Sequence, residues 1–71
     1  MKIFSERLKM VRLEAKESQK ILGDIIEVTA SQIADMESGR RGTTIEKLAL
    51  ICQHYKVSAD YLLGLSDSKR G

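Results

Sequence analysis

The sequence predicts an all-α fold, a compact domain built from five short helices. Apolar residues recur about every 3.6 residues along most of the chain, which is the period of a helix. All but the first of these apolar runs start after a serine or threonine suited to cap a helix. No alternating run of β-branched residues competes with this pattern. With 71 residues, the chain is expected to form a single domain.

The first two helices are predicted from apolar spacing and one capping residue. In the first, basic residues separate the apolar ones, which are Phe4, Leu8, Val11 and Ala15. The second begins at Ser18, because a serine hydroxyl can accept a hydrogen bond from a backbone N–H of the first turn. Its apolar residues are Leu22, Ile25 and Ile26.

Two signals place the start of the third helix at Thr29. Thr29 and Gln32 have the spacing of a capping box, and Val28 and Ile33 have the spacing of a hydrophobic staple around it. The second and third helices are separated by Glu27, Val28 and Thr29 alone. Helices joined by so short a turn cross steeply, as in a helix-turn-helix.

The fourth helix is expected to begin at Thr43 or Thr44, since Thr43 and Glu46 have capping-box spacing. Its expected buried residues are Ile45, Leu48, Cys52 and Tyr55.

The fifth helix begins at Ser58, with Val57 and Leu62 as its staple and Gly64 as its end. The residues after it are polar. We therefore expect a helix-turn-helix domain over 1–65 and a flexible polar tail over 66–71.

Composition argues against several classes of function. Cys52 and His54 are the single cysteine and the single histidine, so no disulfide, no ordinary zinc site and no catalytic triad can be built. We expect no cofactor, no metal and no enzymatic activity. No stretch approaches the roughly 20 apolar residues of a membrane span, and the first residues lack a secretory signal, so the expected location is cytoplasmic. A net charge of +2 permits a nucleic-acid partner.

The third helix has two different sides when its residues are placed about 100° apart. The side expected to face the core carries Ile33, Met36 and Glu37. The opposite side is small and polar, with Ser31, Asp35 and Ser38 at its centre and Ala30, Ala34 and Gln32 beside them.

Cationic residues flank the small polar side. Arg40 and Arg41 follow the third helix, and Lys20 lies near the start of the second, where backbone N–H groups also favour a phosphate. A helix of this kind suits the major groove of double-stranded DNA. The residues expected to contact phosphates are Gln19, Lys20, Ser38, Arg40 and Arg41. The residues expected to contact bases are Thr29, Ala30, Ser31, Gln32 and Asp35, the last by accepting a hydrogen bond from cytosine.

The run SQKILGDIIEVTASQIADMESGRR, residues 18–41, resembles the DNA-binding domain of phage repressors and Cro proteins, the XRE-type helix-turn-helix family. The matching residues are Ser18, Gln19, Leu22, Val28, Thr29, Ile33, Glu37 and Gly39. ERLKMVR upstream and VSADYLLG downstream resemble the family's first and fifth helices, so the likeness covers nearly the whole chain. It implies a compact five-helix repressor-like domain with a central helix-turn-helix, and a small sequence-specific transcriptional repressor.

The resemblance also implies one buried ion pair and a dimer. Arg12 and Glu37 stand where the family joins its first and third helices by a buried ion pair. Such repressors bind palindromic operators as homodimers, at least on DNA. The short fifth helix cannot turn all its apolar residues inward, so the candidate dimer surface is Tyr61, Leu63 and Leu65. The alternative is a ragged edge of the core.

The chain departs from the family pattern at several positions. Glu27 replaces the glycine that often takes a positive φ in the turn, which predicts local strain or a shifted turn. Gly23 replaces an alanine, Glu17 an apolar residue, Thr43 a common proline, and Lys56 the glycine or asparagine that often ends the fourth helix.

Two other functions remain open from the sequence. One is the antitoxin of a toxin–antitoxin pair, which would need a partner toxin. The other is a helix-turn-helix that has lost contact with DNA and serves as a protein-interaction module. The acids Glu27 and Asp35, close to the expected DNA surface, favour the second.

Overall fold

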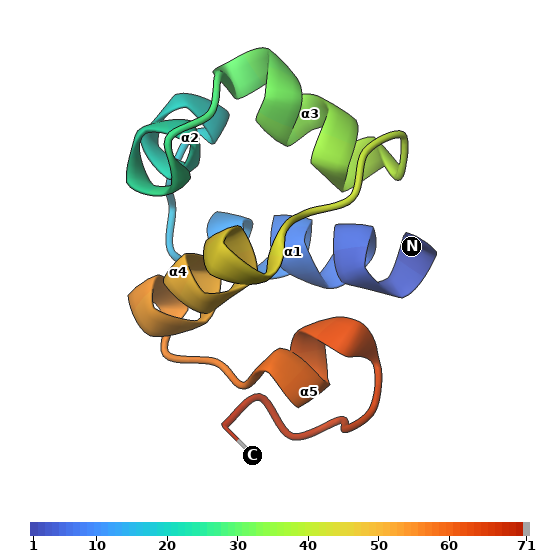
Figure 1. The fold of residues 1–71 in the computed structure, drawn as a ribbon. Coiled ribbons are helices and arrows are strands. Elements are labelled where there is room, and N and C mark those ends of the chain that lie inside the picture. Colours follow the sequence, from blue (N-terminus) through green and yellow to red (C-terminus); the bar gives the residue numbers. More distant parts are fainter. Residues whose placement is uncertain (71) are drawn as a thin grey trace.

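A computed structural model describes residues 1–70, which form five helices and no strand (Figure 1). They are α1 (Lys2–Glu14), α2 (Gln19–Ile26), α3 (Ala30–Ser38), α4 (Ile45–Tyr55) and α5 (Ala59–Leu63). The predicted all-α class and the order of the helices are confirmed. No helix in this part of the chain is both long and apolar enough to cross a membrane.

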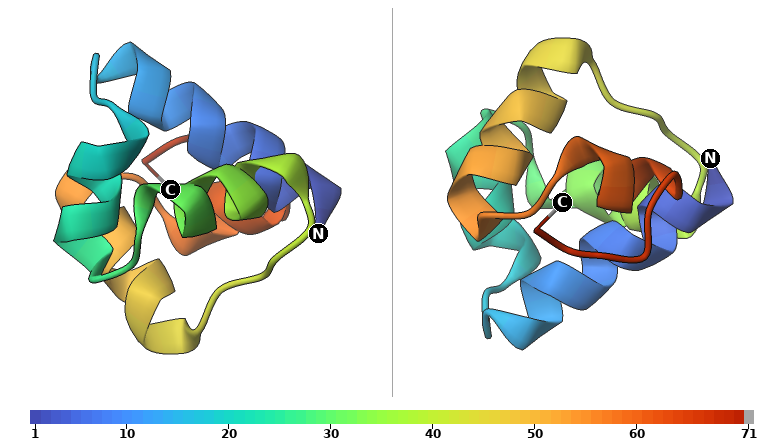
Figure 2. Two further views of the ribbon diagram at one scale, coloured as in Figure 1. Left: turned by 90° about the horizontal axis from the view of Figure 1, so that it is seen from above. Right: turned by 90° about the horizontal axis from the view of Figure 1, so that it is seen from below.

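Helix α1 lies in the middle of the fold. It packs against α3 on one side and α5 on the other, while α4 contacts both α2 and α5 (Figure 1). Helices α2 and α3 cross steeply and share the most extensive interhelical contact (Figure 2, left). The steep crossing expected from the short turn is therefore present.

Each helix contributes to one hydrophobic core. Its fully buried large side chains are Leu8, Leu22, Ile26, Ile33, Met36, Ile51 and Leu62. Burial of one such side chain contributes about 1.5–3 kcal/mol, so a small core of this kind supplies the main stabilising force. From α3, it is Ile33 and Met36 that enter this core, as the sequence predicts.

Hydroxyl side chains cap four of the helices. Ser18, Thr29 and Ser58 each accept a hydrogen bond from a backbone N–H in the first turn, as predicted. At α4 the cap is Thr44, whose Oγ1 accepts from the N–H of Lys47 at 3.2 Å. The predicted Thr43–Glu46 capping box is therefore wrong, because α4 begins one residue later than that box requires.

The predicted buried stripe of α4 needs one correction. Ile45 is 84% exposed, whereas Ile51 is fully buried. Ile45 is the first residue of α4 and lies beyond the edge of the core. Leu48, Cys52 and Tyr55 pack partly buried around Ile51, so the stripe runs through the last two turns of α4 instead.

Two helices end in a left-handed residue that is not glycine, and a third such residue lies just beyond the C-cap of α1. Glu27 has φ 64° after α2, which confirms the positive φ expected at this turn, and Lys56 has φ 56° after α4. Lys16, with φ 58°, follows α1. Each costs about 1–2 kcal/mol relative to glycine in the same conformation. Gly39 and Gly64 end α3 and α5 in the same region without that cost.

The segment after α5 returns along α1 and α5 (Figure 2, right). The Arg7 guanidinium donates to the carbonyl oxygens of Tyr61 and Ser66 at 2.6 and 2.7 Å. Lys69 adds an ion pair with Glu14 at 2.8 Å. The sequence indicated none of these contacts. The division into a domain and a flexible tail stays a prediction, and residue 71 of that tail lies outside the described residues.

Candidate nucleic-acid interface

Two hydrogen bonds hold the turn between α2 and α3 at its α2 end. The N–H of Val28 donates to the carbonyl of Gly23 at 2.8 Å, which closes the last turn of α2 over Glu27. From α4, Lys47 Nζ donates to the carbonyl of Ile26 at 3.1 Å. The cation thus lies at the negative end of the α2 dipole, a favourable place for it.

The predicted capping box begins α3. Thr29 Oγ1 accepts from the N–H of Gln32 at 3.1 Å, and Gln32 Oε1 accepts from the N–H of Thr29 at 2.9 Å. The side-chain oxygen of Gln32 is therefore already engaged. Its Nε2 group is left to donate, which favours acceptor atoms in a partner.

The small polar side of α3 faces outward. Ala30, Ser31 and Ser38 are exposed, and Asp35 is half-buried. This arrangement places methyl, hydroxyl and carboxylate groups on a surface with no bulky side chain, so a partner can approach the helix closely.

A buried ion pair fixes the opposite side of α3. Arg12 Nε and Nη2 lie 2.6 and 3.0 Å from the two carboxylate oxygens of Glu37, and these side chains are 8% and 3% exposed. This is the pair that the family resemblance implies. The hydrogen bond to Glu37 raises the pKa of the Arg12 guanidinium above its usual value. Because both charges are buried, each depends on the other for compensation.

Gln19 and Glu17 extend the ion pair into a network. Gln19 Nε2 donates to Glu37 at 3.2 Å, and Arg12 Nη1 donates to the carbonyl of Glu17 at 2.7 Å. The start of α2 is thereby tied to the last turn of α3. Since the Gln19 amide turns inward, a phosphate contact at this residue would rest on its backbone N–H.

The Glu17 carboxylate was not singled out as a functional group from the sequence. It accepts a hydrogen bond from the Tyr55 hydroxyl at 2.9 Å and lies 2.7 Å from His54 Nε2. Burial, and then the bond to Glu17, raises the pKa of the Tyr55 phenol above its usual value. Glu17 thus replaces the apolar staple of the family with a polar link between the α1–α2 turn and α4.

Cationic residues lie on α2 and directly after α3. Lys20 on α2 is exposed and pairs with Asp24 at 3.1 Å. After α3, the N–H groups of Arg40 and Arg41 both donate to the carbonyl of Asp35, at 3.0 and 3.3 Å. The structure therefore places Arg40 and Arg41 against the C-terminal end of the predicted base-contacting face.

Asp35 and Arg40 also approach through their side chains. Arg40 Nη1 lies 3.8 Å from Asp35 Oδ1, and the two side chains are 80% and 41% exposed. Ser38 Oγ donates its one hydrogen to the Asp35 carbonyl at 3.0 Å, so the expected phosphate contact at Ser38 would require this bond to break, because a phosphate oxygen can only accept.

The candidate dimer surface is only partly exposed. Tyr61 is 6% exposed, and the Arg7 guanidinium lies 4.3 Å from the centre of its ring. The expectation that Tyr61 lies on the surface is therefore wrong, because the core and Arg7 enclose the ring. Leu63 is half-buried, and Leu65 is 75% exposed.

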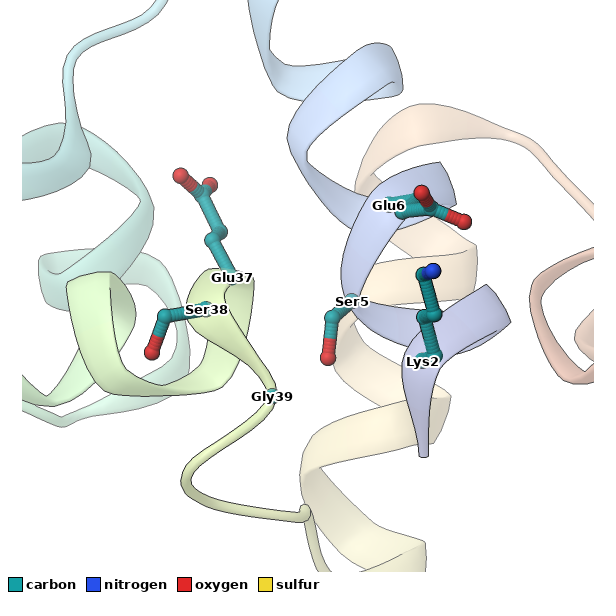
Figure 3. A pocket seen from close by; sticks show the side chains of 6 residues that line it. All are labelled: Lys2, Ser5, Glu6, Glu37, Ser38 and Gly39. Carbon is teal, nitrogen blue, oxygen red and sulfur yellow. The ribbon is translucent and has the colours of Figure 1, made fainter.

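A pocket of about 440 Å³ lies between the start of α1 and the end of α3 (Figure 3). Its lining residues are Lys2, Ser5, Glu6, Glu37, Ser38 and Gly39. The buried Ser5 hydroxyl donates to the Met1 carbonyl at 3.0 Å, and Glu37 is engaged by Arg12. Within residues 1–70, every buried side-chain nitrogen or oxygen has a hydrogen-bond partner. The pocket therefore offers no unpaired buried polar group to a ligand. No cluster of His, Cys, Asp and Glu in the same range could hold a metal ion.

Comparison with known proteins agrees with this geometry. The helix-turn-helix family model matches residues 8–62. An uncharacterised HTH-type transcriptional regulator of Bacillus subtilis, YobD, is 29% identical over 65 residues, which are 92% of this chain and 58% of that protein. The chain thus spans little more than half the length of this relative.

A solved structure shares the fold. The P22 c2 repressor, crystallised in complex with a synthetic operator, superposes with a TM-score of 0.78 at 27% identity, over 83% of this chain and 89% of that one. The family model covers more than half of the chain, and the shared fold agrees with it. The chain therefore belongs to the helix-turn-helix family.

Proposed function

We propose that the chain is a sequence-specific DNA-binding transcriptional regulator, a small repressor that reads the major groove of double-stranded DNA with α3. One observation carries the proposal: the exposed side of α3 has small polar side chains and is followed directly by two arginines, while its other side is anchored in the core. The major groove is wide enough to admit a helix of this kind.

The proposed contacts divide into two sets. Lys20 and Arg41, with the N–H groups at the start of α2, contact phosphates and set the position of the domain on the duplex. Ala30, Ser31, Gln32 and Asp35 face base edges. Because Gln32 Oε1 is engaged in the capping box, its Nε2 group is the one that meets a base acceptor.

The relatives support the proposal at the level of class. The P22 c2 repressor binds an operator, and the B. subtilis relative is an HTH-type transcriptional regulator. We further propose that the chain acts as a homodimer on a palindromic operator, since a two-fold symmetric protein matches two equivalent half-sites. Leu65, an exposed apolar residue two positions after the end of α5, is a candidate for the contact between the two subunits. A regulator of this kind would act in the cytoplasm, where bacterial DNA lies.

A salt titration tests the proposal. The affinity for a mixed-sequence duplex is measured by fluorescence anisotropy at several salt concentrations, and it should fall steeply as salt rises. Replacing Lys20 by alanine should flatten the slope of log K against log salt by about 0.9. Lys9→Ala, which removes an exposed cation from the middle of α1, is the matched control and should leave the slope unchanged.

The same titration separates the proposal from a protein-interaction module. Such a module would show no salt-dependent binding of any duplex. An antitoxin could bind DNA as well, but it would also need a partner toxin. Absence of DNA binding by the folded chain at low salt would refute the proposed function.

A further inference from the structure

Asp35 is the acid at the centre of the outward side of α3, and it has a cationic neighbour. The Gly39 cap turns the chain back over the last turn of α3, so that the N–H groups of Arg40 and Arg41 both reach the Asp35 carbonyl. This turn brings Arg40 Nη1 to 3.8 Å from the Asp35 carboxylate. Among residues 1–70, Arg41 has no acid within ion-pair distance.

A carboxylate on a DNA-facing helix needs a compensating cation, because phosphates repel it. Arg40 supplies that cation from the same surface. The guanidinium carries five N–H donors in a planar fork, so contact with one carboxylate oxygen leaves a pair of donors for another partner. The carboxylate favours those orientations of the exposed arginine in which its guanidinium lies over the outward side of α3.

We infer that Arg40 reads a guanine in the major groove, with Asp35 as the positioning residue that aims its guanidinium. The inference rests on the proposed function and changes the role expected for Arg40 from the sequence, which was a phosphate contact. Arginine donating to both O6 and N7 of guanine is the commonest specific contact between proteins and DNA. The Arg40 guanidinium lies 3.8 Å from the carboxylate of Asp35, a residue on the proposed base-facing side of α3, and this favours a base over a phosphate.

Binding-site selection followed by affinity measurements tests the inference. Duplexes bound by the wild-type chain are selected from a random library to give its preferred sequence. Each position of that sequence is then replaced by the other bases. The dissociation constants are measured for wild type, Arg40→Ala, Arg40→Lys, Asp35→Asn and the double variant with both Arg40→Ala and Asp35→Asn. Arg41→Ala is the matched control, because its arginine is adjacent in the chain and lacks the carboxylate partner.

The expected result is a loss of preference at one position in each half-site. Arg40→Ala should reduce the preference for guanine there by about 5- to 140-fold, the equivalent of 1–3 kcal/mol at 1.4 kcal/mol per tenfold change. Arg40→Lys should keep most of the non-specific affinity but not this preference, since an ammonium lacks the planar fork. Asp35→Asn should lower the preference at the same position, and it should do so much less once Arg40 is absent. Arg41→Ala should weaken all duplexes equally.

Two results would overturn the inference, and they differ from failure of the proposed function. One is a uniform loss of affinity for Arg40→Ala, matching that of Arg41→Ala, which would mean that Arg40 contacts a phosphate. The other is a base preference that changes with Asp35→Asn as much in the absence of Arg40 as in its presence, which would mean that Asp35 acts alone. If the wild-type chain selects no sequence and shows no salt-dependent binding, the proposed function fails first. Circular dichroism melting of each variant checks that these exposed substitutions leave the fold intact.

Discussion

Gly23 and Val28 approach so closely that a β-carbon at Gly23 would lie 2.6 Å from the Val28 carbonyl oxygen. The obstacle is backbone, which cannot rotate away as a side chain can. Close packing of α2 against the α2–α3 turn therefore depends on the missing side chain of Gly23. A glycine here lowers helix propensity by about 1 kcal/mol, and the turn geometry gives a reason for it.

Gly23→Ala should destabilise the fold although alanine is the better helix former. Displacing the turn is expected to cost about 1–3 kcal/mol, which exceeds or cancels the gain of about 1 kcal/mol in propensity. The free energy of unfolding is measured by urea denaturation. Gly42→Ala is the control, because a β-carbon there would meet nothing within 4 Å. A more stable Gly23→Ala variant would show that the turn shifts at little cost.

Glu27→Gly should stabilise the fold by up to about 1 kcal/mol. Glycine removes the left-handed strain of about 1–2 kcal/mol, and the greater entropy of its unfolded chain returns only part of this gain. Glu46→Gly, in the right-handed first turn of α4, should instead destabilise by about 1 kcal/mol. Comparison of the two variants by urea denaturation separates strain relief from the general effect of glycine, and equal losses would disprove the strain.

Truncation of either member of the Arg12–Glu37 pair should cost about 3–5 kcal/mol, because the remaining charge is buried without its partner. Replacing both residues by methionine should cost less than the sum of the two single changes. A double-mutant cycle by urea denaturation measures this coupling. Single losses below about 0.5 kcal/mol would mean that the pair behaves like an exposed one. Lys20→Ala breaks the exposed ion pair with Asp24, and its loss of unfolding free energy gives the reference value for an exposed pair.

Tyr55 should make the stability fall in alkaline solution. Its pKa is raised in the folded chain, so the fold favours the protonated phenol. The resulting stabilisation is fully present below the unfolded pKa of about 10 and is lost as pH rises above it. Between pH 9 and 11, the free energy of unfolding of the wild type should fall more steeply than that of Tyr55→Phe. The difference is at most about 1.4 kcal/mol per pH unit, reduced by solvent screening of the partly exposed ring. Parallel curves for the two proteins would exclude this linkage.

Local features were predictable because their causes lie within a few residues. The Thr29–Gln32 capping box and the Ser18 and Ser58 caps need only side chains that reach backbone N–H groups in the next turn. The left-handed Glu27 followed from the family pattern, in which a glycine often holds this position of the turn. The Arg12–Glu37 contact joins residues 25 apart in the sequence, and only the family resemblance predicted it.

The remaining features depend on how distant elements pack. The Glu17–Tyr55 hydrogen bond joins residues 38 apart, and the Arg7–Asp67 contact joins residues 60 apart. The helical periodicity of apolar residues cannot predict hydrogen bonds between residues so far apart in the sequence. Ile45 was misplaced for a related reason, because helical spacing identifies a stripe of apolar residues but not where along the helix the core ends.

The residues that anchor α3 in the fold and the residues on its exposed surface lie on opposite sides of the helix. Ile33, Met36 and Glu37 anchor it, whereas Ala30 and Ser31 stand exposed. Substitutions at exposed positions usually change stability by no more than about 0.5 kcal/mol. The outward residues can therefore be exchanged, by drift or by design, while the scaffold stays folded. In evolution, a lineage of such proteins could move to new target sequences by steps that each leave a folded protein, and an engineer could graft a different recognition surface onto the same five-helix scaffold.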